Sequence, residues 1–546
     1  MDRIRAVEKR IPDWLLPAAI IVLGAVVRLV ALGSMPGGMH QDESFVAWNA
    51  YAIFHEGMDS AGNIMPVYMA DWGDGHSALY VWLTLPFIAL NGGHVTPFIS
   101  RLPQAIVSIL TLVALQGILQ RVGTRRLALW GSFLLAVCPW HICMSRWGLD
   151  ANLAPGFLVF GLYFFLRGLE KKPFLLLAAF FYGLTLYSYA ICYLTVPLVL
   201  LLQIGYALRT KKLRVDRWSI LSAILLFVIA LPLLLFVAVN QGLLAPIQLS
   251  FLTIPSMSGY RGGEIAFRFS DLWSNLRKTL SLLWHQNTGA PYDILLPWGL
   301  FYDIGRVLAV FGAICLTVKT VLGIRKKEYT PETFLLIQLL GGGIVCMLVT
   351  AVLHQINALY IPIVLCEGYG VCCIIGFVER MVKAKAAREE KASGAAGKVL
   401  PVMTAAVIAG VYLFCFAGFL RDYYGSYRTL VNAYFGEGIQ ECVELAVQTC
   451  NDRNIDTITV EKGAQWPRLL LFTETLPSEY LSSVEYDVAP APASFRTGDI
   501  LVRTRIDYEA ISQESIYIIY YTDEALFSEQ FELYRFGDWF TAIPKA

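Results

Sequence analysis

A pair of adjacent carboxylates, Asp42 and Glu43, follows the first apolar stretch of the chain. Further ionisable residues come shortly afterwards in the same segment, namely Asp59, Asp71, Asp74 and His76. Acidic residues at such a place can simply cap a helix, since they are favoured at helix N-termini. They can also act as general bases. The tryptophans and tyrosines of this segment are suited either to stacking on a sugar ring or to anchoring at a membrane interface.

A second group of polar residues lies between Ser145 and Asn152. Within it, Arg146 can donate paired hydrogen bonds to a phosphate, and Asp150 supplies another carboxylate. Asn152, at the end of the stretch, is a further candidate for substrate contact. The sequence therefore gathers ionisable residues in two segments that lie far apart along the chain.

Three other polar residues have two interpretations each. Arg261, between glycines of the stretch Ser258 to Gly263, is either a phosphate ligand or an ordinary loop arginine. His354 and Asn357 lie between two apolar runs and either cradle a lipid headgroup or are simple interface residues. The sequence shows no metal-type Cys/His spacing and no Gly-rich phosphate loop. It requires no metal and leaves open whether a divalent ion takes part.

The elements that must position these residues are membrane helices. Hydrophobic residues make up 56% of the chain and charged residues only 16%, whereas soluble domains carry about 25% charged residues. Apolar runs of roughly 18 to 22 residues recur, which is the length that crosses a hydrocarbon layer of about 30 Å. The runs predict about eleven transmembrane helices, at 14–33, 102–120, 125–143, 153–169, 174–190, 191–208, 218–238, 303–323, 332–353, 358–378 and 399–420.

Clusters of lysine and arginine between these runs predict the orientation, because positive residues in short loops stay cytoplasmic. They place the N-terminus in the cytoplasm and make loops 34–101 and 240–302 extracytoplasmic. The apolar segment from Ala78 to Leu90 is too short to span, and a span there would invert every later loop. It is therefore predicted to be a helix on the outer membrane surface.

The composition changes after residue 420, where charged residues return. Alternating segments at Thr457–Val460, Ile500–Val502 and Ile516–Tyr520 predict strands, and Glu437–Thr449 predicts an amphipathic helix. The chain is thus predicted to have a transmembrane domain at 1–420 and a small extracytoplasmic α/β domain at 421–546. A net charge of +1 gives no indication of nucleic-acid binding.

Taken in order, these motifs resemble those of the GT-C membrane glycosyltransferases, in particular the protein O-mannosyltransferases and the lipid A aminoarabinose transferases. Those enzymes carry an Asp-Glu pair just after the first helix, matched by Asp42-Glu43. They then have an apolar surface helix followed by Arg-Leu, matched here at Arg101, and a Ser-Arg…Leu-Asp stretch that ends at Asp150. The resemblance covers about residues 14–200. Where the aminoarabinose enzymes place a lysine for the lipid phosphate, this chain has His76.

The resemblance implies a transferase that moves a monosaccharide from a polyprenyl-phosphate donor to an acceptor hydroxyl on a lipid, glycan or protein, at the outer face of the plasma membrane. Such an enzyme must deprotonate the acceptor and stabilise the departing phosphate. Asp42 is then the candidate base, and Glu43 and Asp150 orient the base or the acceptor. The phosphate candidates are Arg101, Arg146, His76 and Arg261. Direct displacement would invert the anomeric centre.

Two other functions remain open from the sequence. A transporter or flippase of lipid-linked sugars would use the same acids to bind cations or substrate, although such proteins often carry inverted repeats that are not visible here. A non-catalytic scaffold of cell-wall assembly would use the tail as a binding module. It does not explain why acidic and basic residues gather in two separate loops.

Overall fold

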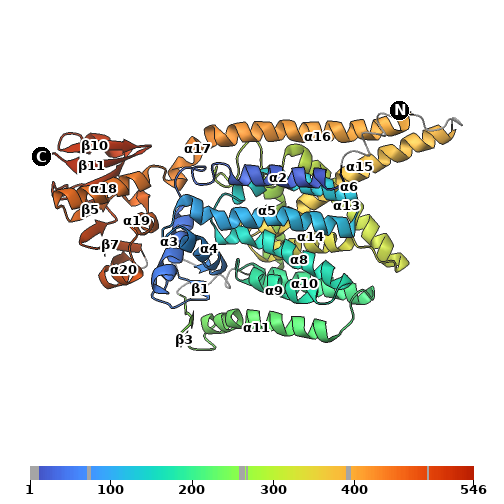
Figure 1. Cartoon of the computed structure of the whole chain (residues 1–546), viewed down its shortest axis with the longest axis horizontal. Coiled ribbons are helices and arrows are strands. Elements are labelled where there is room, and N and C mark those ends of the chain that lie inside the picture. Colours follow the sequence, from blue (N-terminus) through green and yellow to red (C-terminus); the bar gives the residue numbers. More distant parts are fainter. Residues whose placement is uncertain are drawn as a thin grey trace.

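The computed structural model describes residues 12–70, 75–257, 265, 268–388, 395–488 and 491–545. Long helices run side by side in one bundle, and a small sheet-containing domain lies at one end of it (Figure 1). The segment that carries Asp42 lies between the bundle and this domain. The fold is therefore that of a polytopic helical membrane protein with an α/β domain after its last long helix, as the sequence predicts.

A helix occurs at each predicted transmembrane run. The helices are α2 (Leu15–Leu29), α5 (Pro97–Val122), α6 (Arg125–Ala136), α8 (Ala154–Glu170), α9 (Phe174–Leu186), α10 (Cys192–Arg209), α11 (Arg217–Asn240), α13 (Asp303–Lys326), α14 (Thr333–Leu348), α15 (Tyr360–Arg388) and α16 (Ala395–Tyr424). Among the described residues, 7 helices are long and apolar enough to cross a membrane, while α2, α9 and α14 are apolar but shorter. The membrane fold is confirmed, and the number of complete spans among these helices stays a prediction.

The run predicted as one span at 125–143 differs from the prediction. It is broken into α6 and the short helix α7 (Pro139–Met144). The break falls where Pro139 occupies the first turn of α7, because proline has no N–H to continue the preceding helix. The chain after α7 is thereby turned toward the polar segment that holds Arg146.

The short apolar segment forms α4 (Leu79–Leu90). Twelve helical residues rise only about 18 Å, so α4 cannot cross the membrane alone. It packs against α3 (Gln41–Glu56) and α5, at the end of the bundle nearest the sheet domain (Figure 1). Two short hairpins lie in the inter-helix segments, β1 (Tyr68–Met69) with β2 (His76–Ser77) and β3 (Ile247–Leu249) with β4 (Leu252–Ile254), as does the amphipathic helix α12 (Phe269–His285).

A mixed seven-stranded sheet forms the core of the sheet domain, which we define as residues 439–488 and 491–545. The strand order is β10-β11-β9-β5-β8-β7-β6, with β5 parallel to both β8 and β9. Strands β5 (Thr457–Val460), β8 (Ile500–Arg503) and β9 (Ile516–Tyr520) lie where alternation predicts them. The remaining elements are β6 (Glu485–Val488), β7 (Ala491–Thr497), β10 (Phe531–Phe536), β11 (Trp539–Pro544), α18 (Ile439–Arg453), α19 (Trp466–Phe472), α20 (Pro477–Ser483) and α21 (Glu524–Phe527), and α17 (Ser426–Phe435) joins the domain to α16.

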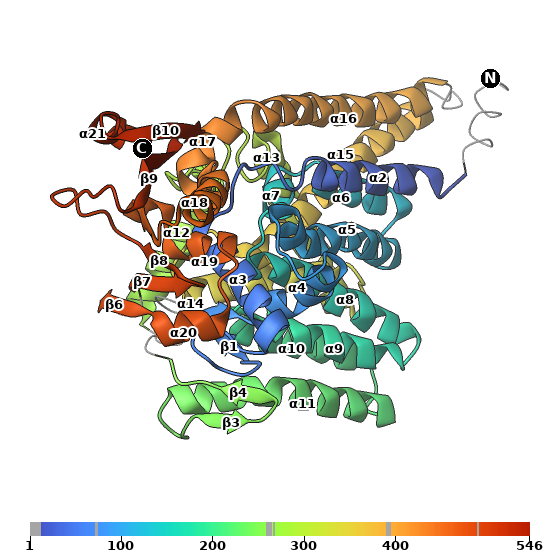
Figure 2. The ribbon, with the colours of Figure 1, turned by 60° about the vertical axis from the view of Figure 1, so that its left-hand side comes forward.

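The sheet domain packs directly on α3, and Figure 2 shows α19 and α20 against this helix. The fully buried Trp48 donates its indole N–H to the carbonyl of Thr475 at 2.9 Å, and the Tyr51 hydroxyl donates to the carbonyl of Glu474 at 3.0 Å. These contacts fix α3 between the bundle and the sheet domain.

Candidate active site

The first turn of α3 is closed by a reciprocal cap. The side chain of Glu43 accepts a hydrogen bond from the backbone N–H of His40, while Nδ1 of His40 accepts one from the backbone N–H of Asp42, both at 3.3 Å. This arrangement satisfies N–H groups that a helix start leaves without partners. It holds the Asp42 carboxylate at the helix N-terminus, 3.7 Å from Nδ1 of His40 and with 29% of its side chain exposed.

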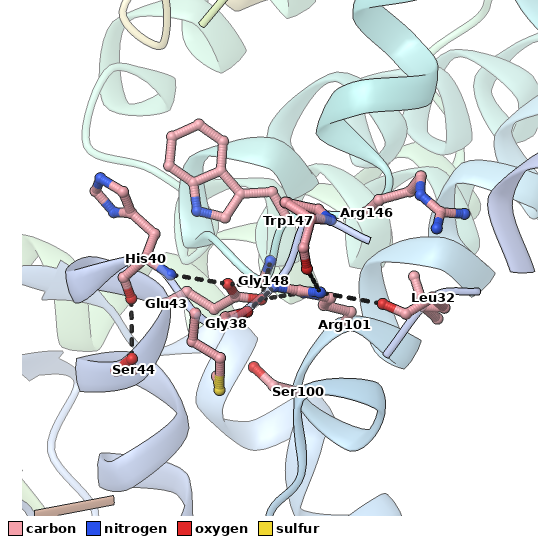
Figure 3. A network of polar contacts seen from close by, with 12 residues as sticks. Leu32, Gly38, His40, Glu43, Ser44, Ser100, Arg101, Arg146, Trp147 and Gly148 are labelled. Carbon is pink, nitrogen blue, oxygen red and sulfur yellow. Dashed lines mark hydrogen bonds and ion pairs between the residues drawn. The ribbon is translucent and has the colours of Figure 1, made fainter. Parts of the chain in front are cut away.

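The neighbouring carboxylate points the other way. Glu43 is fully buried and forms a two-pronged ion pair with Arg101, at 2.8 and 3.2 Å (Figure 3). It also accepts a hydrogen bond from the backbone N–H of Gly148 at 3.2 Å. Glu43 therefore joins α3 to α5 and to the segment that begins at Ser145.

Arg101 holds the loop between α2 and α3. Besides Glu43, its guanidinium group donates to the carbonyls of Leu32, Pro36 and Gly38 at 2.6 to 3.2 Å. Together these bonds use every N–H group of the side chain, which is fully buried. Gly38 has a φ of +70°, and a Cβ there would lie 2.4 Å from the carbonyl oxygen of Phe435. The loop can follow this path only with glycine at that position.

Arg146 has a similar role at the C-terminal end of α2. It donates to the carbonyls of Val27, Arg28, Ala31 and Met35 at 2.8 to 3.2 Å, and its Nε donates to the hydroxyl of Tyr423 at 3.1 Å. These bonds again use every N–H group of a fully buried side chain. The predicted phosphate contacts of Arg101 and Arg146 thus do not fit the observed bonding, because each guanidinium group already has a protein acceptor for every N–H.

The other predicted residues form a second cluster beside the first. Nδ1 of His76 lies 3.5 Å from the Asp150 carboxylate, which also accepts the backbone N–H groups of Ser77 and Ala151 at 2.8 Å. Asn357 donates to the carbonyl of Ala151 at 2.7 Å. The buried Asn152 donates to the carbonyl of Trp147 at 3.2 Å, so Asp150, Asn152 and Asn357 all brace the same loop. Asp71, Asp74 and Arg261 lie outside the described residues.

Aromatic rings surround His40 beside Asp42. Its ring centroid lies 5.0 Å from Trp147, 5.5 Å from Tyr292 and 5.7 Å from Phe435, and we call these four residues the aromatic enclosure. Trp147 also contacts His354, at 5.3 Å between ring centroids. Sequence reasoning missed the enclosure, because its rings come from four distant segments. Trp147 alone carried a signal, since it lies in the polar stretch around Arg146.

Charge and burial both shift pKa values at the start of α3. Burial lowers the pKa of His40 to about 3, assisted by the positive charge of Arg468. Burial also lowers the pKa of Arg468 to about 10, against the opposing effect of the Glu43 and Asp42 carboxylates. Arg468, on α19, donates to the carbonyl of Met39 at 2.7 Å. The sheet domain thus brings a buried positive charge to the start of α3, and no local sequence pattern indicates it.

Two further features are a contact between His354 and the loop before α13, and an apolar cavity among the helices. Nε2 of His354 lies 3.9 Å from Asp293, whose pKa burial raises to about 6. The cavity, of about 340 Å³, lies among α12, α13, α14 and α15 and is lined almost entirely by apolar side chains. Arg306 contributes to its lining and contacts Asp303 and the carbonyl of Trp284, and its buried Nε has no partner among the described residues.

Metal binding would need several ligands close together. Within the described part of the chain, no three His, Cys, Asp or Glu side chains form such a group. The observed arrangement is instead a part-exposed carboxylate beside an aromatic enclosure. The basic side chains Arg468 and His354 lie near the enclosure, and the apolar cavity lies among α12, α13, α14 and α15. Such a carboxylate can remove a proton from a hydroxyl, and the apolar cavity can hold part of a lipid chain.

The sequence matches no protein-family model and no curated protein. Solved structures do match the fold. ArnT from Cupriavidus metallidurans has a TM-score of 0.52 in its apo state and 0.50 bound to undecaprenyl phosphate, at 12% identity over 96% of this chain and 97% of that one. An oligosaccharyltransferase from Archaeoglobus fulgidus has a TM-score of 0.52 at 10% identity, over 84% of this chain and 61% of that one. This chain therefore has the GT-C fold of these membrane glycosyltransferases.

Proposed function

We propose that this protein is a membrane glycosyltransferase that moves a monosaccharide from a polyprenyl-phosphate donor to an acceptor hydroxyl on the outer face of the membrane. The observation that carries the proposal is the part-exposed Asp42, held by a helix cap beside the aromatic enclosure. The GT-C fold supports it, as does the similar ArnT structure that is bound to undecaprenyl phosphate.

The donor would lie along the line from the apolar cavity to Asp42. The cavity is suited to part of the prenyl chain, since burying apolar surface contributes about 25 cal/mol per Å². Arg306 lines that cavity and His354 contacts Trp147 of the enclosure, and both are basic groups that can meet the phosphate. The sugar would lie at the edge of the aromatic enclosure beside Asp42, where the half-buried Tyr292 can offer an aromatic face to a sugar ring. Arg261 stays a candidate for the phosphate.

The reaction then needs one proton transfer and one displacement. Asp42 takes the proton of the acceptor hydroxyl, whose oxygen attacks C1 of the sugar. The bond between C1 and the phosphate oxygen breaks, and polyprenyl phosphate leaves with the bonding electron pair. A single displacement of this kind inverts the anomeric centre.

The buried residues have supporting roles in this proposal. Glu43 and Arg101 fix the first turn of α3 and with it the direction of Asp42. Asp150, paired with His76, and Arg146 fix the segment that presents Trp147. We therefore assign Arg101 and Arg146 as positioning residues.

The test is a transfer assay in liposomes. The reconstituted protein is given polyprenyl phosphate that carries a radiolabelled sugar, together with a cell-envelope extract as acceptor. The label should leave the lipid and appear on acceptor material or as free sugar. Movement of the intact lipid-linked sugar across the bilayer, without cleavage, would overturn the proposal in favour of a transporter.

A further inference from the structure

A second cavity, of about 470 Å³, lies where the sheet domain meets the start of α3. Ligand-binding cavities in proteins typically measure about 300 to 1,000 Å³, so this one can hold a small sugar unit. Gln41 lines it from α3, and the sheet domain contributes polar and aromatic residues, chiefly Lys462, Gln465, Trp466, Asp487 and Arg505. The donor reaction described above makes no use of this cavity.

Gln465 carries two marks of a binding residue. Its backbone has φ 62° and ψ 124°, a strained conformation for a residue other than glycine. Its side-chain Oε1 is buried without a hydrogen-bond partner among the described residues. A buried acceptor of this kind gains free energy when a ligand donates a hydrogen bond to it.

The cavity lies beside the helix turn that carries the proposed base. Gln41, in its lining, directly precedes Asp42 along α3. Trp466 lines the cavity too, and its ring lies 6.0 Å from Phe45, one turn further along the same helix. A molecule bound here lies against the first turn of α3, on the side formed by the sheet domain.

The lining also indicates the chemistry of the ligand. Trp466 offers an aromatic surface, and Gln41, Gln465 and Thr504 offer groups that bond hydroxyls. Lys462 and Arg505 outnumber the single acid Asp487, so the rim carries a net positive charge. These groups suit a sugar that bears a negatively charged substituent.

We propose that this cavity is the acceptor site and that the acceptor is a saccharide with a carboxylate or phosphate group. The inference rests on the proposed transferase activity. In this proposal, the sheet domain determines which acceptor hydroxyl reaches Asp42, while the bundle binds the donor.

Binding is tested first, on the full-length protein in nanodiscs. The probes are a glucuronic acid disaccharide, a phosphorylated disaccharide and a neutral glucose disaccharide. At least one charged probe should bind roughly ten-fold more tightly than the neutral one, the scale of one charge-assisted hydrogen bond. The two charged probes separate a carboxylate ligand from a phosphate ligand. Equal binding of all three, or binding of none, would overturn the proposal.

Lys462→Gln and Arg505→Gln should each remove much of this preference for charge. Both side chains are exposed, so folding should be unaffected. Arg503→Gln is the matched control, because Arg503 is an exposed arginine of the same region that does not line the cavity. A similar loss of preference in the control variant, or none in the first two, would contradict the assignment.

The variant Gln465→Gly distinguishes a loss of acceptor binding from a loss of stability. Glycine relieves the backbone strain and removes the side-chain oxygen, so the melting temperature should rise while the KM for acceptor rises roughly ten-fold. Arg503→Gln is again the control, and in it both the acceptor KM and the slow release of free sugar to water should stay at parental values. An unchanged acceptor KM in Gln465→Gly would refute the acceptor site alone. A parent protein that releases no sugar at all would refute the proposed transferase.

Discussion

At the scale of single residues, two adjacent carboxylates have different environments. Successive residues of a helix point about 100° apart, so the side chains of Asp42 and Glu43 face different surroundings on α3. Asp42 lies toward the aromatic enclosure with 29% of its side chain exposed, whereas Glu43 is buried against Arg101. The pair thus combines one group that can meet a substrate with one that fixes the backbone carrying it.

Replacement of Asp42 by asparagine should remove the base and leave the fold intact. Turnover should fall by roughly 100-fold or more, the usual contribution of a general base, while donor binding stays unchanged. The measurement is sugar transfer in membranes, with thermal stability and donor affinity determined alongside. Glu43→Gln is the paired variant, and we expect it to lower stability first and activity less. Parental transfer rates in Asp42→Asn would rule out the base assignment.

Removal of Arg101 should affect folding more than donor binding. Arg101→Ala leaves the Glu43 carboxylate buried without its partner, and breaking a buried pair in this way costs about 3–5 kcal/mol. We expect a large fall in melting temperature in detergent, only partly restored by Arg101→Lys, because lysine lacks the two-pronged geometry. A variant with parental stability that no longer binds donor would instead make Arg101 a phosphate ligand.

At the scale of elements, the cap of α3 depends on a neutral imidazole. Nδ1 of His40 accepts the N–H of Asp42, which it can do only without a proton on that nitrogen. Burial and the charge of Arg468 keep it neutral by lowering the pKa to about 3. An ordinary histidine is protonated below about pH 6.5.

The folded state should therefore lose stability as the pH falls. Below about 6.5 the unfolded chain gains a proton on His40 that the folded protein gains only near pH 3, so acid favours unfolding throughout that interval. Between pH 7 and pH 5 this single group contributes a loss of about 2 kcal/mol. His40→Asn keeps a capping side chain without a titrating ring, and its melting temperature should fall less over the same range. Parallel pH curves for both proteins would contradict this account.

At the scale of the whole molecule, the bundle and the sheet domain each supply part of the site. Trp48 and Tyr51 of α3 donate hydrogen bonds to the sheet domain, and Arg468 of the sheet domain donates back to Met39. The proposed base therefore lies at a junction, where the proposed donor and acceptor would approach it from different sides.

The proposed orientation places this junction outside the cytoplasm. A reporter fused after Ala546 should be active only outside, and one inserted after Lys327, between α13 and α14, only inside. This follows from the basic clusters, because positive loops stay cytoplasmic. A cytoplasmic C-terminus would contradict both the orientation and an active site at the outer face.

The sequence by itself was enough to predict the short α4, three strands of the sheet and the helices of the bundle, apart from the break between α6 and α7. These elements depend on local patterns: a run of apolar residues must satisfy its own backbone in lipid, and alternation gives a strand two faces. It also indicated Asp42 and Glu43 as candidates for the site, because the pair follows directly after the first helix, and their catalytic role stays a prediction.

Only the tertiary structure decided what the arginines do and what surrounds the base. Arg101 and Arg146 look alike as phosphate ligands in the sequence, but packing gives each of them a full set of carbonyl, carboxylate or hydroxyl acceptors. Arg468 bonds Met39 across 429 residues of chain. Such partners are fixed by how the elements pack and by the cost of leaving a buried polar group unpaired, and no local spacing encodes either of these.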